Sequence, residues 1–328
     1  MITSSNLKYW LLFGSLFVFV VLWTVYWFIA ANWITGKAQA KIERYRTQNI
    51  QIETQKMNVS GWPYRFALTL EGTQITLPPE QGGAQVFVPV FRLHAMAWKL
   101  SHLIAELPED IRIRNQTDQE WTYHSTRTRA SIKITKAKIS RFSLEMIAPQ
   151  LSDSSDQPIY SAQNLDAHLR PGTDPDSRKL YARAERPNWP DMPLRDLQQI
   201  ELQGEVFSWS ALRGEPDLAA FRAASGHLVL ERAYARTEQA SINLSGTFHL
   251  DKNGYAAGPL KIKMQRPADL IAALDQSRFN FEKKKGLGIF SVLTGGVDET
   301  ELSFRLKKGG IYSGPFRLVS TPLLLSSP

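Results

Sequence analysis

The sequence predicts a mainly β protein: an elongated antiparallel β-sheet domain with a few short helices, behind one N-terminal transmembrane helix. Three observations lead to this fold class. Residues 9–36 contain no charged side chain. Apolar and polar residues alternate in short segments from Phe66 to Leu318, which is typical of half-buried strands. Few segments of the remaining chain have a helical pattern.

The N-terminal segment predicts a membrane anchor at residues 9–33. Tyr9 to Ala31 is uninterruptedly apolar or neutral, and a helix needs roughly 20 such residues to cross about 30 Å of hydrocarbon. Aromatic side chains, which prefer the headgroup level, lie near its two ends: Tyr9, Trp10, Trp23, Tyr26, Trp27 and Trp33. A signal peptide has an apolar region of roughly 7–15 residues, so we expect an uncleaved anchor.

The orientation of the anchor does not follow from charge alone. Basic residues at 37–46 are opposed only by Glu43, whereas Lys8 precedes the segment. Counting positive charges would place the C-terminal side in the cytoplasm, but large downstream domains are translocated largely regardless of that bias. Residues 34–56 are expected to form a helical connector, because Ala30 to Gln48 can continue the anchor helix.

Strands are expected wherever the chain alternates with period two. These segments contain Phe66/Leu68/Leu70, Ile75/Leu77, Ile111/Ile113, Phe142/Leu144/Met146, Ile200/Leu202, Ile242/Leu244, Phe248/Leu250, Leu260/Ile262/Met264, Leu302/Phe304/Leu306 and Phe316/Leu318. Turns are expected at Glu71-Gly72, at residues 251–254 and at residues 308–310. Residues 57–328 are therefore treated as one β-rich domain.

Three short helices and three loops complete the expected order of elements. The helices are predicted at Glu215–Ser225, Pro267–Gln276 and Phe279–Leu293, two of which have proline near the first turn. Residues 149–158, 171–177 and 187–193 are rich in Asp, Ser, Asn or Pro and are expected to be loops. Such short helices cannot cover the apolar face of so many strands. The sheet is therefore either a closed sandwich or a curled groove with an apolar lining.

Composition and motifs give no sign of an enzyme. The chain has no cysteine, which excludes disulfides and cysteine-ligated metal. None of its six histidines has metal-ligand spacing, and there is no nucleophile elbow or phosphate-binding loop. We expect no cofactor, no metal and no catalytic residue, although a triad assembled from distant residues is invisible in a sequence.

A basic run follows the middle of the chain. Its members are Arg127, Arg129, Lys133, Lys136, Lys138 and Arg141, and no acidic residue lies between Glu120 and Glu145. Two interpretations remain open: a solvated strand face that discourages edge pairing, or a contact for lipid headgroups or an acidic partner. Nucleic acid is not an expected partner, because the run lacks interleaved aromatic residues.

The segment Gly61-Trp62-Pro63-Tyr64-Arg65-Phe66 is the sharpest local motif. It predicts a turn followed by the start of a strand, with Trp62, Tyr64 and Phe66 stacked on one face. With the preceding Met57-Asn58-Val59-Ser60, the anchor and the long β region, it resembles the bacterial envelope family of domain of unknown function 2125. The closing strands are similar, more distantly, to those of AsmA and TamB type proteins.

This resemblance implies an inner-membrane anchor with residues 1–8 in the cytoplasm and residues 57–328 in the periplasm; it offers no catalytic residues. We expect a non-enzymatic protein that binds or transfers lipid, or acts in envelope homeostasis, along an apolar β groove. The candidate lining residues are Phe66, Leu68, Leu70, Ile242, Leu244, Leu260 and Ile262. Membrane lipids are the expected partners. The alternatives are an envelope scaffold that docks protein partners on a closed sandwich and, third, a hydrolase of envelope polymers.

Overall fold

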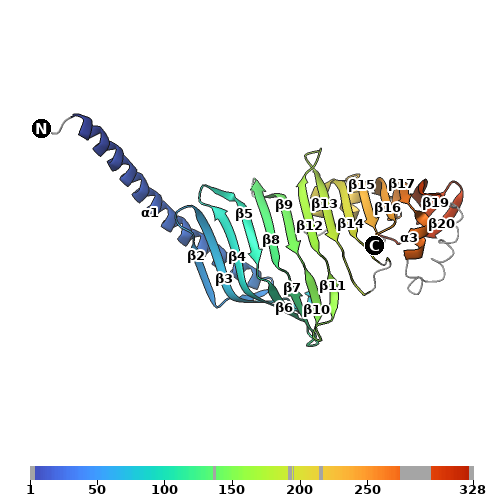
Figure 1. The fold of residues 1–328 in the computed structure, drawn as a ribbon, viewed down its shortest axis with the longest axis horizontal. Helices are drawn as coiled ribbons and strands as arrows, with labels where there is room; N and C mark the ends of the chain where they lie inside the picture. Colours follow the sequence, from blue (N-terminus) through green and yellow to red (C-terminus); the bar gives the residue numbers. More distant parts are fainter. Residues whose placement is uncertain are drawn as a thin grey trace. The chain divides into compact units, whose positions relative to one another are not determined.

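The computed structural model describes residues 4–135, 138–190, 194, 196–213, 217–273 and 297–324. These residues form mostly β-strands, with one long helix at the N-terminus and a few short ones (Figure 1). The chain divides into two compact units where the sequence predicted one β domain. The first unit is Met1–Lys138 with Asp153–Asp156, and the second is Ile139–Ser152 with Gln157–Pro328.

The first unit begins with helix α1 (Ser4–Arg46). Residues Tyr9–Arg46 make it long and apolar enough to cross a membrane, with a mean hydropathy of 2.2 in its most apolar window. The predicted continuation of the anchor helix is confirmed as far as Arg46. Strand β1 (Gln51–Glu53) then begins inside the region predicted as a helical connector, so the connector is helical only in its first part.

Seven more strands follow in the first unit. They are β2 (Lys56–Ser60), β3 (Arg65–Thr76), β4 (Gln85–Met96), β5 (Lys99–Leu107), β6 (Asp110–Arg114), β7 (Glu120–His124) and β8 (Arg127–Thr135), with the 3-10 helix η1 (Pro79–Gln81) between β3 and β4. Strand β3 pairs with β1 and β2 and also with β4. Strand β4 pairs with β5 and β6, which pair with β8 and β7 respectively. All these pairs are antiparallel.

The predicted turn at Glu71-Gly72 is wrong. Both residues lie inside the single long strand β3, and Glu71 pairs with Val90 of β4. Gly72 has a φ of 58°, a conformation that only glycine adopts at little cost. The chain therefore uses this glycine for an irregularity within a continuous strand and does not reverse direction there.

The second unit is also built from antiparallel strands. They are β9 (Lys138–Ile147), β10 (Gln150–Asp153), β11 (Pro158–Ser161), β12 (Asn164–Pro171), β13 (Ser177–Glu185), β14 (Gln199–Phe207), β15 (His227–Arg236), β16 (Ser241–Leu250), β17 (Ala256–Gln265), β18 (Glu299–Lys307), β19 (Gly310–Ser313) and β20 (Phe316–Ser320). Three short helices join them: η2 (Trp209–Leu212), α2 (Leu218–Ala223) and α3 (Pro267–Ala273).

The second unit follows a simple order. Strand β12 pairs with β9 and β13, and from β13 to β20 each strand pairs with the next one along the chain. The predicted turns at residues 251–254 and 308–310 are confirmed between β16 and β17 and between β18 and β19. The predicted loop at residues 149–158 is partly wrong, because β10 occupies Gln150–Asp153 and pairs with β11.

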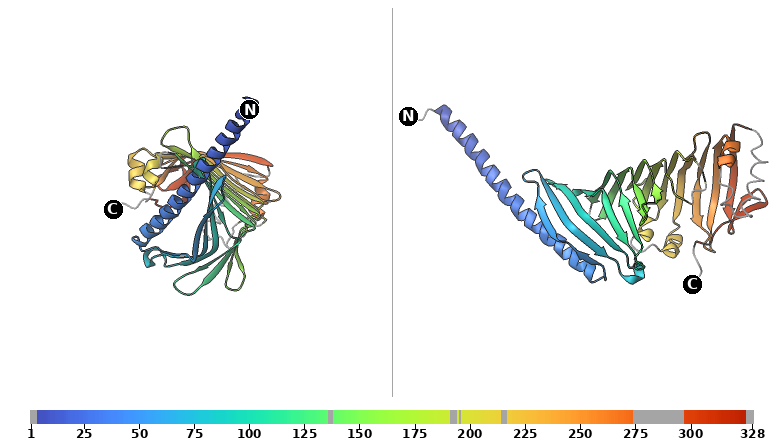
Figure 2. Two further views of the ribbon diagram at one scale, coloured as in Figure 1. Left: turned by 90° about the vertical axis from the view of Figure 1, so that its left-hand side faces the viewer. Right: turned by 60° about the horizontal axis from the view of Figure 1, so that its bottom comes forward.

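The described strands of each unit lie in an open sheet and do not form the closed sandwich (Figure 2). Of the two predicted forms of the antiparallel sheet, closed or open, the described residues therefore adopt the open one. Helices α2 and α3 confirm two of the three predicted short helices, with narrower bounds. The third, Phe279–Leu293, lies outside the described residues, as do residues 215–216 of the first prediction and residues 274–276 of the second.

Candidate functional site

Three rows of apolar side chains cross eight strands of the second unit, β9 and β12–β18. Residues that face each other in an antiparallel pair project to the same side of the sheet, so the register defines each row. Row A is Met146, Leu165, Ala184, Ile200, Ala235, Ile242, Met264 and Thr300. Row B is Leu144, Ala167, Ala182, Leu202, Ala233, Leu244, Ile262 and Leu302. Row C is Phe142, Leu169, Leu180, Gly204, Leu230, Gly246, Leu260 and Phe304.

The three rows make one face of this sheet continuously apolar. Row A contains a single polar side chain, that of Thr300, and rows B and C contain none. With neighbouring strands about 4.8 Å apart, eight strands extend the rows over about 34 Å. A sheet face of this size and composition is normally covered by another layer of the protein.

Row B is only partly covered by the described residues. None of its eight side chains is fully buried, and Leu202 is 44% exposed. Helix α3 covers one end of the rows, where Leu270 packs against Met264, with Ile262 and Leu302 at the border of the contact. The described part of the second unit thus presents an apolar face with partial cover at β16–β18.

The opposite face of the same strands is polar. Residues that alternate with row B are Glu145, Asp166, Arg183, Glu201, Tyr234, Asn243, Lys263 and Glu301. Ion pairs lie on it, such as Arg232 Nε with Glu201 Oε1 at 3.5 Å. A shallow hollow of about 330 Å³ lies over this face, with Arg170, Lys179 and Tyr181 in its lining. The two faces of this sheet therefore differ in polarity.

The first unit has apolar rows of the same kind. One row is Val59, Leu68, Leu93, Ala105 and Ala130, and its neighbour is Phe66, Ala95, Leu103 and Ile132. A third joins the other ends of the strands through Ile52, Ile75, Val86, Ile113 and Trp121. Here the N-terminal helix supplies part of the cover, because Trp27 and Ala31 of α1 form a buried cluster with Phe66 and Ala97.

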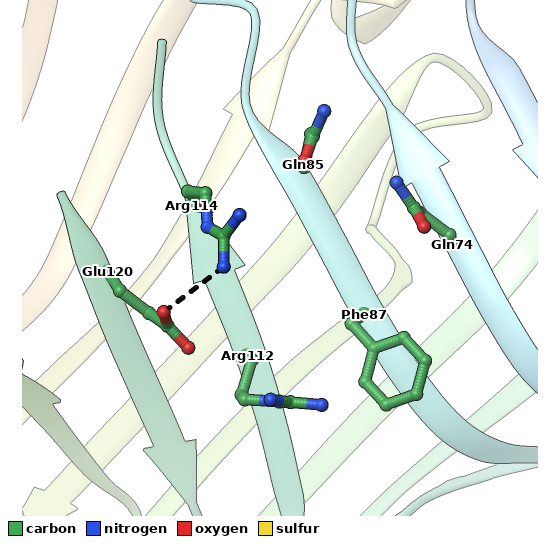
Figure 3. Close-up of a pocket in the computed structure, with 6 residues that line it drawn as sticks. All are labelled: Gln74, Gln85, Phe87, Arg112, Arg114 and Glu120. Carbon is green, nitrogen blue, oxygen red and sulfur yellow. Dashed lines mark hydrogen bonds and ion pairs between the residues drawn. The ribbon is translucent and has the colours of Figure 1, made fainter. Parts of the chain in front are cut away.

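A polar hollow lies on the face opposite the third of these rows, because its lining residues alternate along the strands with the residues of that row. Its volume is about 240 Å³, and its lining side chains come from β3, β4, β6 and β7 (Figure 3): Gln74, Gln85, Phe87, Arg112, Arg114 and Glu120. Arg114 Nη2 lies 3.5 Å from Glu120 Oε2, and the Arg112 guanidinium lies 4.9 Å from the centre of the Phe87 ring. Its cations are thus engaged locally, one with a carboxylate and one with a ring.

The predicted lining residues are divided between the two units. Ile242 and Leu244 of β16 and Leu260 and Ile262 of β17 lie on adjacent strands and belong to rows A, B and C. Leu68 and Leu70 belong to the first unit, on β3. Phe66 is only 2% exposed, because its ring stacks on that of Trp27 at 5.3 Å. The Phe66 side chain therefore contacts the helix and is closed to a ligand.

The segment Gly61 to Phe66 is confirmed as a turn followed by the start of β3. Gly61 has a φ of 105°, and a Cβ there would lie 2.7 Å from Arg65 Cγ, so the turn requires glycine. The Trp62–Pro63 peptide bond is cis. The predicted stack of three rings is wrong, because Trp62 and Tyr64 are exposed in the turn while Phe66 packs against α1.

The basic run is divided between the two units. Arg127, Arg129 and Lys133 alternate along β8 with apolar residues or Thr128, as predicted. Arg129 Nη2 pairs with Glu106 Oε1 on β5 at 3.3 Å. Lys138 ends the first unit, Arg141 belongs to the second, and Lys136 lies outside the described residues. The Arg129–Glu106 pair favours the interpretation as a solvated strand face.

One serine and one histidine meet on the polar face of the first unit. His102 Nε2 lies 2.9 Å from Ser131 Oγ, and His94 Nε2 lies 3.2 Å from Glu106 Oε2. A nucleophilic serine also needs an orienting group on the histidine and donors for an oxyanion. Among the contacts described for His102 there is no carboxylate. In the described part of the chain, no group of three or more His, Asp or Glu residues could hold a metal ion.

A buried carboxylate secures the turn between β12 and β13. Glu205 of β14 is 4% exposed, and its Oε1 accepts hydrogen bonds from Thr173 N at 2.5 Å, from Thr173 Oγ1 at 2.8 Å and from the Ser177 hydroxyl. Burial raises the pKa of Glu205, but the hydrogen bonds and the charge of Lys179 outweigh it and hold the pKa below the usual 4.5. Gly172 belongs to this cluster too, because a Cβ there would lie 2.2 Å from Glu205 Oε1.

Replacing Glu205 by alanine should lower the free energy of unfolding of the protein by about 3 kcal/mol, since it leaves several donors unpaired. Because the folded pKa is lowered, the stabilisation is present above the unfolded pKa and disappears as the pH falls through the folded one. Denaturant unfolding of parent and variant at a series of pH values measures this. The unfolding free energies of parent and variant should converge at acid pH. A difference in unfolding free energy that is constant at all pH values would contradict the prediction.

Sequence reasoning missed two features of this arrangement. Glu205 stands in an ordinary alternating strand, and nothing in its neighbours marks it as buried. Rows A and B were found only in part, because alanines at positions such as Ala167, Ala182 and Ala233 gave a weak hydrophobic signal. The recurrence of Ala between polar residues in β12, β13 and β15 is the signal that could have revealed the rows.

Comparisons with known proteins agree with the family suggested by the N-terminal motif and the long β region. No curated protein and no solved structure matches the chain, so its distant similarity to AsmA and TamB type proteins stays a prediction. A family model described as "Uncharacterized protein conserved in bacteria (DUF2125)" matches residues 27–322. That range begins within α1 and includes both sheets, and the chain belongs to this family.

Proposed function

We propose that this protein is a non-enzymatic lipid-binding protein of the bacterial envelope that holds acyl chains against the apolar rows of its sheet. The observation that carries the proposal is row B, a continuous apolar row across eight strands with an exposed leucine at its middle. The apolar N-terminal part of α1 anchors the chain in the inner membrane, and residues 57–328 stand in the periplasm; the predicted anchor bound of residue 33 is too long, because Trp27 and Ala31 pack against the sheet. This topology rests on the family resemblance and on the apolar helix.

The energetics favour a lipid as the occupant. Burying one methylene contributes about 0.8 kcal/mol, so ten would contribute about 8 kcal/mol before ordering costs. That is comparable with micromolar binding. The anchor keeps the sheet close to its source of lipid, which raises the effective concentration of the ligand.

The scaffold alternative is less well supported than the lipid proposal. It was based on a closed sandwich, whereas the described strands are open. An envelope protein that docks on the apolar rows remains the second candidate partner. The hydrolase has one observation in its favour, the contact of Ser131 with His102, but both residues lie on regular strands whose backbone donors serve the sheet.

A photo-crosslinking experiment tests the lipid proposal with a matched control. A photoreactive phenylalanine derivative is placed at Leu202 in row B or at its exposed neighbour Gln203 on the opposite face. After irradiation of the full chain in native membranes, mass spectrometry identifies the adducts. We expect lipid adducts at position 202 and few at 203. Protein adducts at 202 would support the scaffold, and equal labelling at both positions would end the proposal.

A further inference from the structure

Helix α1 contacts the sheet of the first unit through the last turns of its apolar run. Trp23 Nε1 donates to the carbonyl of Pro63 at 2.9 Å, the Tyr26 hydroxyl donates to the carbonyl of Ala97 at 3.1 Å, and Trp27 Nε1 donates to the carbonyl of Arg65 at 3.1 Å. In Figure 2 the C-terminal half of α1 lies along the first strands and its N-terminal half extends clear of them.

These hydrogen bonds place two turns beside the helix. One is the turn between β2 and β3, residues 61–64, and the other is the turn between β4 and β5, residues 97–98. The two turns are themselves joined, because Ala97 N donates to the carbonyl of Tyr64 at 3.0 Å. We call residues 61–65 and 96–100 together the tip pair.

The tip pair exposes large apolar side chains. Tyr64 is 69% exposed, Trp98 64%, Trp62 51%, Met96 48% and Leu100 38%. Its charged residues, Arg65 and Lys99, are both exposed and basic. No acidic residue occurs between Glu53 and Glu71 or between Glu80 and Glu106. Exposed Trp and Tyr with nearby basic residues are the composition that proteins place at a membrane–water interface.

The length of the apolar run decides where the tip pair stands relative to a bilayer. From Tyr9 to Trp27 a helix rises about 27 Å, close to the roughly 30 Å of hydrocarbon that it must cross. If the tip pair stood in water, the span would have to end before Trp23. Tyr9–Leu22 would then supply only about 20 Å, which is too short.

We infer that the tip pair is inserted in the lipid interface of the membrane that α1 crosses, on the side where the helix leaves it. Trp62, Tyr64, Met96 and Trp98 lie at the boundary of headgroups and acyl chains, and Arg65 and Lys99 face the lipid phosphates. The bilayer is thus a partner of the folded domain as well as of the helix. The inference rests on the anchor proposed above and does not require lipid to bind along the rows.

Because the chain has no cysteine, single cysteines can carry an environment-sensitive fluorophore. The reporters are Trp62→Cys and Trp98→Cys, each replacing an exposed side chain, with Tyr64→Cys as an additional one that keeps every tryptophan. Gln116→Cys is the aqueous control, since it is exposed in the turn between β6 and β7, where Arg114 pairs with the start of β4. Ser15→Cys in α1 reports on the anchor.

The labelled full-length proteins are reconstituted in vesicles of phosphatidylethanolamine and phosphatidylglycerol with a quencher on the lipid at a shallow or a deep position, or with iodide in the water. We expect the tip-pair labels to be quenched by the shallow lipid at least twofold more than position 116, and to be protected from iodide. Iodide quenching equal to that at position 116 would overturn the inference.

The label at position 15 separates the two proposals. Deep-lipid quenching there, together with iodide-accessible tip-pair labels, would refute the inserted tip pair and leave the anchor intact. Iodide access at position 15 would refute both, because a chain that does not cross the membrane has no interface at Trp23. Circular dichroism of each variant in the same vesicles confirms that the strands are retained.

Discussion

Replacing Leu244 by arginine should reduce lipid adducts at position 202 by more than about 10-fold. Leu244 and Leu202 lie in the same row, separated by one strand, through Ala233. An unpaired charge on a surface that must be desolvated by an acyl chain costs several kcal/mol, and each 1.4 kcal/mol is a factor of about 10 in binding. The measurement is the yield of lipid adducts after irradiation, relative to the parent.

Thr247→Arg is the matched control for this substitution. Thr247 lies on the same strand as Leu244, is exposed and alternates to the polar face, where it pairs with Val229. The Thr247→Arg substitution adds the same charge without touching rows A, B or C, so the yield of lipid adducts should stay near that of the parent. Both variants must retain the circular dichroism of the parent. A folded Leu244→Arg protein with unchanged lipid adducts would show that row B is not the lipid surface.

The fold class could be predicted from the sequence because the alternation of side chains is local information. Strands such as β9, β16 and β17 have Leu, Ile, Phe or Met at several alternate positions, and this signal needs no knowledge of the partner strand. Strand β4 was not predicted, since Pro89 in its middle is a residue that usually ends a strand. Its neighbour β3 was divided at Gly72 for a similar reason.

The candidate site could be predicted only in part, because a row across a sheet is a property of the register. Leu244 and Ile262 were expected on the same apolar face, and the register confirms this by making them cross-strand partners. Which alanines complete the row depends on pairings between segments that are distant in sequence, such as Ala182 with Leu202. The role of Phe66 was not predictable either, since its partner is a tryptophan of the helix that had been assigned wholly to the membrane.

Replacing Phe66 by alanine should give the largest loss of stability of any single change considered for the first unit. The ring is 2% exposed and lies in the cluster that joins α1 to the sheet. Truncating a buried phenylalanine costs about 3–5 kcal/mol, through lost burial and the cavity left behind. The stacked contact with Trp27 adds about 0.5–1.5 kcal/mol that the smaller side chain cannot replace.

Denaturant unfolding of the full chain in detergent, followed by near-ultraviolet circular dichroism, measures this loss. Tyr64→Ala is the control, because it removes an aromatic ring two residues away that is 69% exposed, and its cost should be about 0.5 kcal/mol or less. The double variant with Trp27→Ala tests the contact itself: the two losses should not add, since each substitution removes the same stacked pair. If Phe66→Ala costs no more than Tyr64→Ala, the helix is not held by this cluster, and the position of the tip pair at the membrane loses its structural basis.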